Sequence, residues 1–295
     1  MQATDPLPPS SVALPTLIDL RLGLRRSLLR PAPGWAFLAG LLLSPYGLPE
    51  DPAQALAGVL LAFILVDPVW GALWHHLLIA ARRLVATTTA MAPPLPYAQE
   101  RAPLARLWAW WRHEHTFGGR GTWLALLPTL ALSLVLGRPA LVASAVALLA
   151  GLLAAALMPV SPGSVRVLAA LVAIVMPWYV GLMGLAPASA SLWPVVEAGT
   201  TPLAASVLTW GLPLVVAWLA WLDDDPSVTA ASPVGRLGLI AGHGLLVGCL
   251  VLAGKPFVAG LLALMLLWPT LTLRRPGANP APWHLFALIV IAILG

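Results

Sequence analysis

Four aspartates lie inside or directly beside apolar stretches of the sequence. Asp67 lies deep in one apolar run and is followed by Pro68, while Asp223, Asp224 and Asp225 come directly after another run. Proline lacks a backbone donor and interrupts the hydrogen bonding of a helix, so we expect a kink at Pro68. Carboxylates in or beside a membrane span are costly unless they are solvated, paired or bound to a metal. These four side chains are therefore the first candidates for a functional site.

Each of these carboxylates has a structural interpretation beside a functional one. Asp67 could be a hydrogen-bonded side chain that stabilises the kink, or it could face a ligand inside the membrane. The run 223–225 could be a solvated helix end, although negative charge there opposes the helix dipole. A divalent cation would compensate this charge, because Mg²⁺ binds one or two carboxylates together with phosphate oxygens and water. The residues alone leave both interpretations open for each group.

The histidines give weaker signals for chemistry. His75 and His76 are adjacent, so on a helix they point about 100° apart and cannot share a metal as an i, i+4 pair does. We expect a structural or interfacial role for them, and a solvated position for His113 and His115. His243 lies in an apolar run, where it could line a cavity, although core packing is the simpler interpretation. The sequence has no Walker-type, GxSxG or GxGxxG pattern, so nucleotide binding and serine hydrolysis have no support.

The elements that must position these side chains are membrane spans. Hydrophobic residues make up 60% of the 295 residues and charged residues only 9%, against about 25% charged in a soluble domain. We therefore expect an integral membrane protein. A span needs roughly 17–25 residues, and the apolar runs predict an all-α polytopic bundle of about nine transmembrane helices, at 34–48, 53–80, 122–136, 140–158, 167–186, 202–222, 236–253, 256–273 and 282–295.

The basic residues predict the orientation of this bundle. With nine spans and a cytoplasmic N-terminus, only Arg138 and Lys255 of the 16 basic residues fall on the far side of the membrane. The positive-inside rule therefore favours a cytoplasmic N-terminus, in the inner membrane of a bacterium. The chain has a net charge of +5. Because its basic residues lie where the membrane orientation places them, we expect no nucleic-acid partner.

The chain divides into a tail and one bundle. We expect residues 1–33 to be a cytoplasmic N-terminal tail and residues 34–295 to form a single transmembrane bundle, with its main cytoplasmic loops at 82–121 and 223–235. The first loop contains the segment 104–115, LARLWAWWRHEH, in which arginines alternate with leucines and tryptophans. Such spacing is typical of an amphipathic helix at the membrane interface.

This arrangement resembles the UbiA superfamily of intramembrane prenyltransferases. The segment 173–186, AIVMPWYVGLMGLA, is similar to the fifth span of heme O synthase-type members, and 207–238 is similar to their sixth span and following loop. The resemblance implies that Mg²⁺, held by two acidic motifs, binds a polyprenyl diphosphate whose prenyl group passes to a ring acceptor such as a quinone or porphyrin. It implies Asp67, Asp224 and Asp225 as metal ligands, with Asp223 also in the catalytic set.

The resemblance also implies phosphate-binding roles for basic residues on the predicted cytoplasmic side. Arg82 and Arg83 follow the first acidic motif, and Arg166 lies between the fourth and fifth predicted spans. These three guanidinium groups would contact the diphosphate.

The first acidic motif departs from the family pattern, which has several carboxylates. Only Asp67 is matched, Val66 stands at the asparagine position, and Trp70 and Trp74 stand at the later acidic positions, where they would lie in the substrate space. Two functions follow. One is a divergent prenyltransferase. The other is a non-catalytic relative that binds a lipid, quinone or pigment, or serves as a structural subunit of a membrane complex. A transporter is less favoured, because ionisable residues are scarce within the spans.

Overall fold

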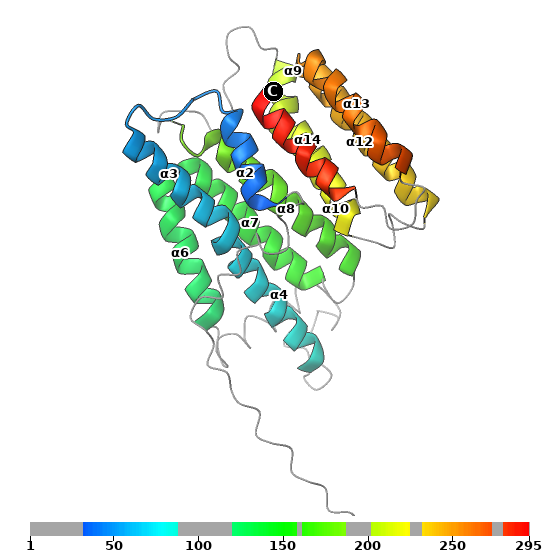
Figure 1. Cartoon of the computed structure of the whole chain (residues 1–295). Coiled ribbons are helices and arrows are strands. Elements are labelled where there is room, and N and C mark those ends of the chain that lie inside the picture. Colours follow the sequence, from blue (N-terminus) through cyan, green and yellow to red (C-terminus); the bar gives the residue numbers. More distant parts are fainter. Residues whose placement is uncertain are drawn as a thin grey trace, which may run out of the picture.

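The computed structural model describes residues 32–87, 120–157, 161–186, 202–224, 232–272 and 280–294. These residues are helical, with no strand among them, and their helices pack into one bundle (Figure 1). Five of the helices are long and apolar enough to cross a membrane, and four shorter apolar helices accompany them in this part of the chain. The predicted all-helical architecture is confirmed for these residues, and the five long apolar helices are compatible with an integral membrane protein. Each predicted apolar run overlaps one or more of the described helices.

Six of the eleven α-helices in the described part of the chain begin at a proline. The helices are, in chain order, α2 (Pro33–Leu42), α3 (Pro52–Ile64), the π-helical turn η1 (Leu65–Val69), α4 (Trp70–Thr87), α6 (Arg120–Leu136), α7 (Arg138–Leu157), α8 (Pro162–Met183), α9 (Pro202–Ser206), the π-helical turn η3 (Val207–Gly211), α10 (Leu212–Asp224), α12 (Pro233–Leu252), α13 (Pro256–Thr272) and α14 (Ala281–Leu294). Proline suits the first position of a helix, because its fixed φ is helical and the N–H it lacks has no partner there.

Helices α2 and α8 form the centre of the bundle. Their backbones touch at two glycines: a Cβ on Gly40 would overlap the carbonyl oxygen of Trp178, and one on Gly181 would overlap that of Phe37. Small residues at a helix crossing allow such close approach, which strengthens packing inside a membrane. The indole of Trp178 is fully buried beside this crossing.

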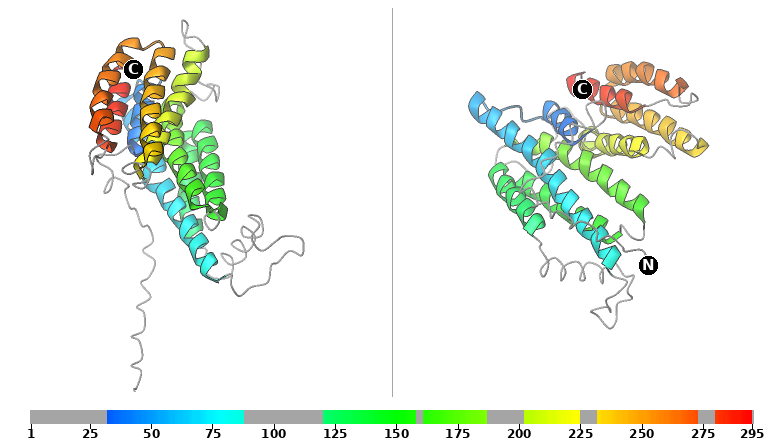
Figure 2. Two further views of the ribbon diagram at one scale, coloured as in Figure 1. Left: turned by 90° about the vertical axis from the view of Figure 1, so that its right-hand side faces the viewer. Right: turned by 60° about the horizontal axis from the view of Figure 1, so that its bottom comes forward.

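The other helices lie on either side of this central pair. On one side lie α3, η1, α4, α6 and α7, and on the other lie α10 and α14, followed by α12 and α13 (Figure 1). In the left view of Figure 2, α4 projects beyond the ends of α12, α13 and α14. The outer faces carry exposed leucines, for example Leu127, Leu130 and Leu134 on α6. Such faces suit contact with lipid.

The helix boundaries differ from the predicted loops in two places. Helix α4 continues to Thr87, so Arg82 and Arg83 lie on a helix, and α10 continues to Asp224. Arginine is a good helix former, so the pair 82–83 marks no helix end. The predicted N-terminal tail up to residue 31 and the amphipathic segment 104–115 lie outside the described residues.

Candidate functional site

Asp67 lies in η1, at the break between α3 and α4. Pro68 has no N–H to donate, and the π-helical turn takes up the resulting mismatch between the two helices. The kink expected at this proline is present. The Asp67 side chain is only 4% exposed, although it carries a carboxyl group.

The carboxyl group of Asp67 faces the beginning of α2. A Cβ built on Gly34 would lie 3.6 Å from Asp67 Oδ2 and would overlap the ring of Phe63. No side chain caps the N-terminus of α2, and the unpaired N–H groups of a helix N-terminus favour negative charge nearby. Among the described residues, Asp67 has no hydrogen-bond partner. Its polar group is therefore left in a largely apolar environment.

Trp70 and Trp74 attach α4 to α7. The Trp70 Nε1–H donates to Ser144 Oγ at 3.0 Å, and the Trp74 Nε1–H donates to the Ala147 carbonyl oxygen, also at 3.0 Å. Ser144 in turn lies 2.7 Å from Ser133 Oγ on α6. Both indoles are buried. The positions where the resemblance has carboxylates are thus occupied by side chains that join three helices.

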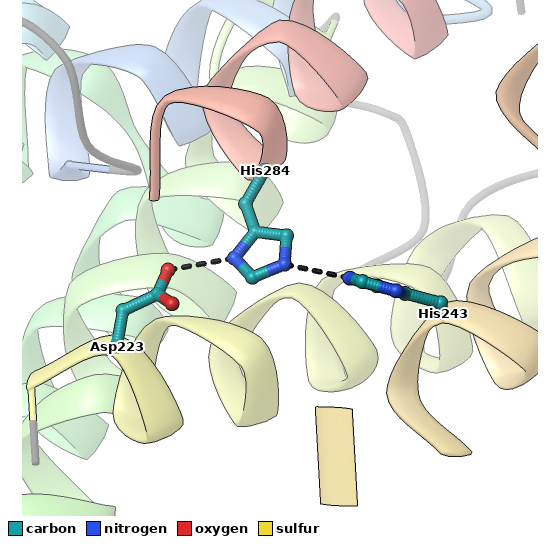
Figure 3. A network of polar contacts seen from close by, with 3 residues as sticks. All are labelled: Asp223, His243 and His284. Carbon is teal, nitrogen blue, oxygen red and sulfur yellow. Dashed lines mark hydrogen bonds and ion pairs between the residues drawn. The ribbon is translucent and has the colours of Figure 1, made fainter. Parts of the chain in front are cut away.

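A second polar site joins four helices on the other side of α2 and α8. Asp223 Oδ2 lies 2.6 Å from His284 Nδ1, and His284 Nε2 lies 2.9 Å from His243 Nε2 (Figure 3). His243 Nδ1 lies 2.9 Å from Thr270 Oγ1, whose hydroxyl donates to the Leu266 carbonyl oxygen at 2.6 Å. The side chains come from α10, α14, α12 and α13 in that order. They form one continuous chain of hydrogen bonds, which we call the Asp223–Thr270 network.

This network is buried and leaves one oxygen without a partner. The side chain of Asp223 is 3% exposed and that of His284 is 1% exposed. Asp223 Oδ2 is bonded, but Asp223 Oδ1 has no hydrogen-bond partner. Asp223 lies at the C-terminus of α10, where the helix dipole opposes its charge, whereas its hydrogen bond to His284 brings it to the first turn of α14, where the positive end of the dipole favours a carboxylate. His284 and the first turn of α14 thus stabilise Asp223, and the divalent cation considered in the sequence analysis stays a prediction.

The other predicted site residues lie elsewhere or are not described in full. The side chains of Asp224, Arg82 and Arg83 lie outside the described residues, as does all of Asp225. Arg166 is exposed near the beginning of α8. The sequence analysis missed His284, whose signal was a histidine in the first turn of an apolar helix. It singled out His243 with core packing as the simpler interpretation, whereas the structure gives it a hydrogen bond at both ring nitrogens.

The two buried aspartates do not form one site. Helix α8 packs against η1 and α7 on one side and against α10 on the other, and α2 packs against both α8 and α14. The turn η1, which carries Asp67, and α10, which carries Asp223, therefore pack on different sides of α8. Within the described part of the chain, no three His, Cys, Asp or Glu side chains come together as a metal site would require. The donor groups described there do not fit a shared Mg²⁺–diphosphate site.

No family model, curated protein or solved structure matches this chain. The UbiA resemblance therefore remains a prediction from the residues.

Proposed function

We propose that this protein is a membrane-embedded binding protein of UbiA-like architecture, which holds a ring compound of the quinone or pigment class and transfers no prenyl group. The observation that carries this proposal is Asp67, a residue that is only 4% exposed and whose carboxyl group has no hydrogen-bond partner among the described residues. Sites for such ligands are mostly apolar, with a few polar groups that fix the ligand's orientation. Asp67 offers one such group.

The surroundings of Asp67 suit binding better than diphosphate chemistry. A diphosphate with its Mg²⁺ ions needs several carboxylates and guanidinium groups around it. Beside Asp67, the matching positions carry Trp70 and Trp74, whose indoles are bonded to α7. Asp223 lies across the central helix pair and is bonded to His284. A neutral ring ligand needs none of these missing charges.

Extraction of the purified protein tests the proposal. The protein is isolated from its native membrane in mild detergent, and its lipid-soluble content is identified by chromatography with mass spectrometry. We expect a ring compound at close to one per chain in the wild type. We expect its loss in Asp67→Leu, which keeps the branching of the side chain at Cγ and removes the polar group.

Asp51→Asn is the matched control for this experiment. Asp51 is exposed and caps α3, on the same predicted span as Asp67, and asparagine caps equally well. We expect this variant to retain the compound. A wild-type protein without any ring compound, or an Asp67→Leu protein that retains it fully, would contradict the proposal.

Prenyl transfer is the second candidate, and one observation favours it. Asp67 lies in a π-helical turn, and such turns are frequent at functional sites. The assay uses purified protein, labelled polyprenyl diphosphates of several lengths and a panel of quinone and porphyrin-type acceptors, with and without Mg²⁺. A product that depends on Mg²⁺ and is lost in Asp67→Asn would replace the binding function by the enzymatic one.

The proposal includes the orientation with a cytoplasmic N-terminus in a bacterial inner membrane. It is supported by the asymmetry of the basic residues, with Arg138 and Lys255 alone on the far side. Reporter fusions at Gly137, Gly163 and Gly295 test it. We expect the fusions at Gly137 and Gly295 to report the periplasm and the fusion at Gly163 to report the cytoplasm. A cytoplasmic signal at Gly295 would overturn the orientation.

A further inference from the structure

We propose that His243 and His284 form a binding site for one exchangeable proton, and that the loss of this proton reverses the hydrogen bonds between His284 and Thr270. The proposal concerns the Asp223–Thr270 network alone and does not depend on the ligand at Asp67. It follows from counting the protons that the observed distances require.

The count begins at Thr270. A hydroxyl group has one proton to donate, and the Thr270 hydroxyl donates it to the Leu266 carbonyl oxygen at 2.6 Å. In the 2.9 Å contact with His243 Nδ1, Thr270 Oγ1 must therefore accept. His243 consequently carries a proton on Nδ1, which leaves its Nε2 free to accept when the ring is neutral.

The count continues through the two imidazole rings. His243 Nε2 accepts across the 2.9 Å contact, so His284 Nε2 must carry a proton. At 2.6 Å from Asp223 Oδ2, His284 Nδ1 and the carboxyl group share one further proton. The two rings and the carboxyl group therefore hold three protons in these contacts. The network as a whole is neutral, which suits its burial.

Removal of one proton to solvent leaves a second complete arrangement. His284 keeps the proton on Nδ1 that faces Asp223, and its Nε2 becomes an acceptor. His243 then donates from Nε2, and its Nδ1 accepts from the hydroxyl of Thr270. The two rings hold two N–H protons, so the balance is one proton released, and the network carries one negative charge. The three contacts between side chains persist in both arrangements.

The second arrangement removes one bond inside α13. The Thr270 hydroxyl turns toward His243 and no longer donates to Leu266. Pro269, beside it, cannot donate to the carbonyl group one turn earlier. The last turn of α13 therefore loses the hydrogen bond from the Thr270 hydroxyl to the Leu266 carbonyl oxygen when the proton leaves. Proton binding between α12 and α14 is thus coupled to the end of α13.

Other ionisable groups lie on the elements packed around the two rings. They are Arg236 and Cys249 on α12, Asp224 on α10, and Arg166 and Tyr179 on α8, while α2 and α13 carry none within their helical residues. The Nε of Arg236 makes no hydrogen bond. The proton exchange is assigned to the two rings, because they lie in the bonded path between Asp223 and Thr270.

Nitrogen NMR of the two rings tests the proposal. The full chain, with ¹⁵N-labelled histidine, is studied in lipid nanodiscs on both sides of neutral pH, and signals are assigned with His243→Gln and His284→Gln. We expect His243 Nδ1 to be protonated at low pH and bare at high pH. We expect His284 Nε2 to lose its proton over the same pH interval. A His243 Nδ1 that keeps one state while His284 changes, or two rings that never change, would overturn the proposal.

Variants at Thr270 separate this switch from ordinary packing. Thr270→Val keeps the shape and removes the oxygen, so a proton on His243 Nδ1 would have no acceptor. We expect His243 in this variant to hold its proton on Nε2 at every pH, and Thr270→Ser to restore the switch. A Thr270→Val protein that switches like the wild type would overturn the proposal. So would a transition metal bound at one per chain in the purified protein and released in His243→Gln, because it would replace the shared proton.

Discussion

Asp67 and Asp223 are both buried aspartates on apolar helices, but their carboxyl groups differ in hydrogen bonding. Asp223 is bonded to His284 on α14 and, through it, to α12 and α13. Asp67 lies at a π-helical turn and has no hydrogen-bond partner among the described residues. A buried polar group with a partner stabilises the native packing, while one without a partner costs free energy. The Asp223 side therefore joins four helices, and the Asp67 side is the one that we propose for a ligand.

The largest expected effect is the loss of His284. In His284→Ala, Asp223 loses its one bonded partner in the described part of the chain while it remains buried, and breaking a buried pair in this way costs about 3–5 kcal/mol. Asp67→Leu, in contrast, removes a carboxyl group that has no partner among the described residues, so we expect an unchanged or higher melting temperature when no ligand is bound. Thermal unfolding of both variants in detergent measures the difference. Equal melting temperatures would contradict the assignment of the two sides to different roles.

A smaller effect is expected at the central pair that separates the two sites. In Gly40→Ala the new methyl group would overlap the Trp178 carbonyl oxygen, and overpacking of this kind costs about 1–3 kcal/mol. Gly260→Ala on α13 is the control, because a Cβ there meets no atom within 4 Å. Unfolding in detergent should separate these two variants. If Gly40→Ala and Gly260→Ala have the same melting temperature, the close approach of α2 and α8 is not essential to the packing.

The smallest effect is expected at the two tryptophans beside Asp67. Trp74→Phe loses one hydrogen bond to the Ala147 carbonyl oxygen, at a cost of about 1 kcal/mol. Trp70→Phe should cost less, because Ser144 keeps its contact with Ser133. If either variant instead abolished ligand retention while the protein stayed folded, the indole would belong to the binding site rather than to the α4–α7 contact.

The sequence predicted the helices well and their polar contacts poorly. Long apolar runs identify helices because only helices satisfy the backbone inside a membrane, and the pattern at Pro68 predicted the break in η1. The end of α4 was misplaced because Arg82 and Arg83 were taken as the beginning of a loop. The Asp223–Thr270 network was missed because its partners are far apart in sequence. His284 follows Asp223 by 61 residues and His243 by 41, and helix periodicity gives no information about such pairs.

The central claim is that Asp67 and Asp223 belong to separate sites, and a double-mutant cycle tests it most directly. Asp67→Leu, Asp223→Ala and the double variant are unfolded in detergent, with and without Mg²⁺. Independent sites add within about 0.3–0.5 kcal/mol, so we predict that the free-energy change of the double variant equals the sum of the single changes, with or without Mg²⁺. A coupling of about 1 kcal/mol or more that appears only with Mg²⁺ would contradict the account, because it would place both carboxylates in one metal site.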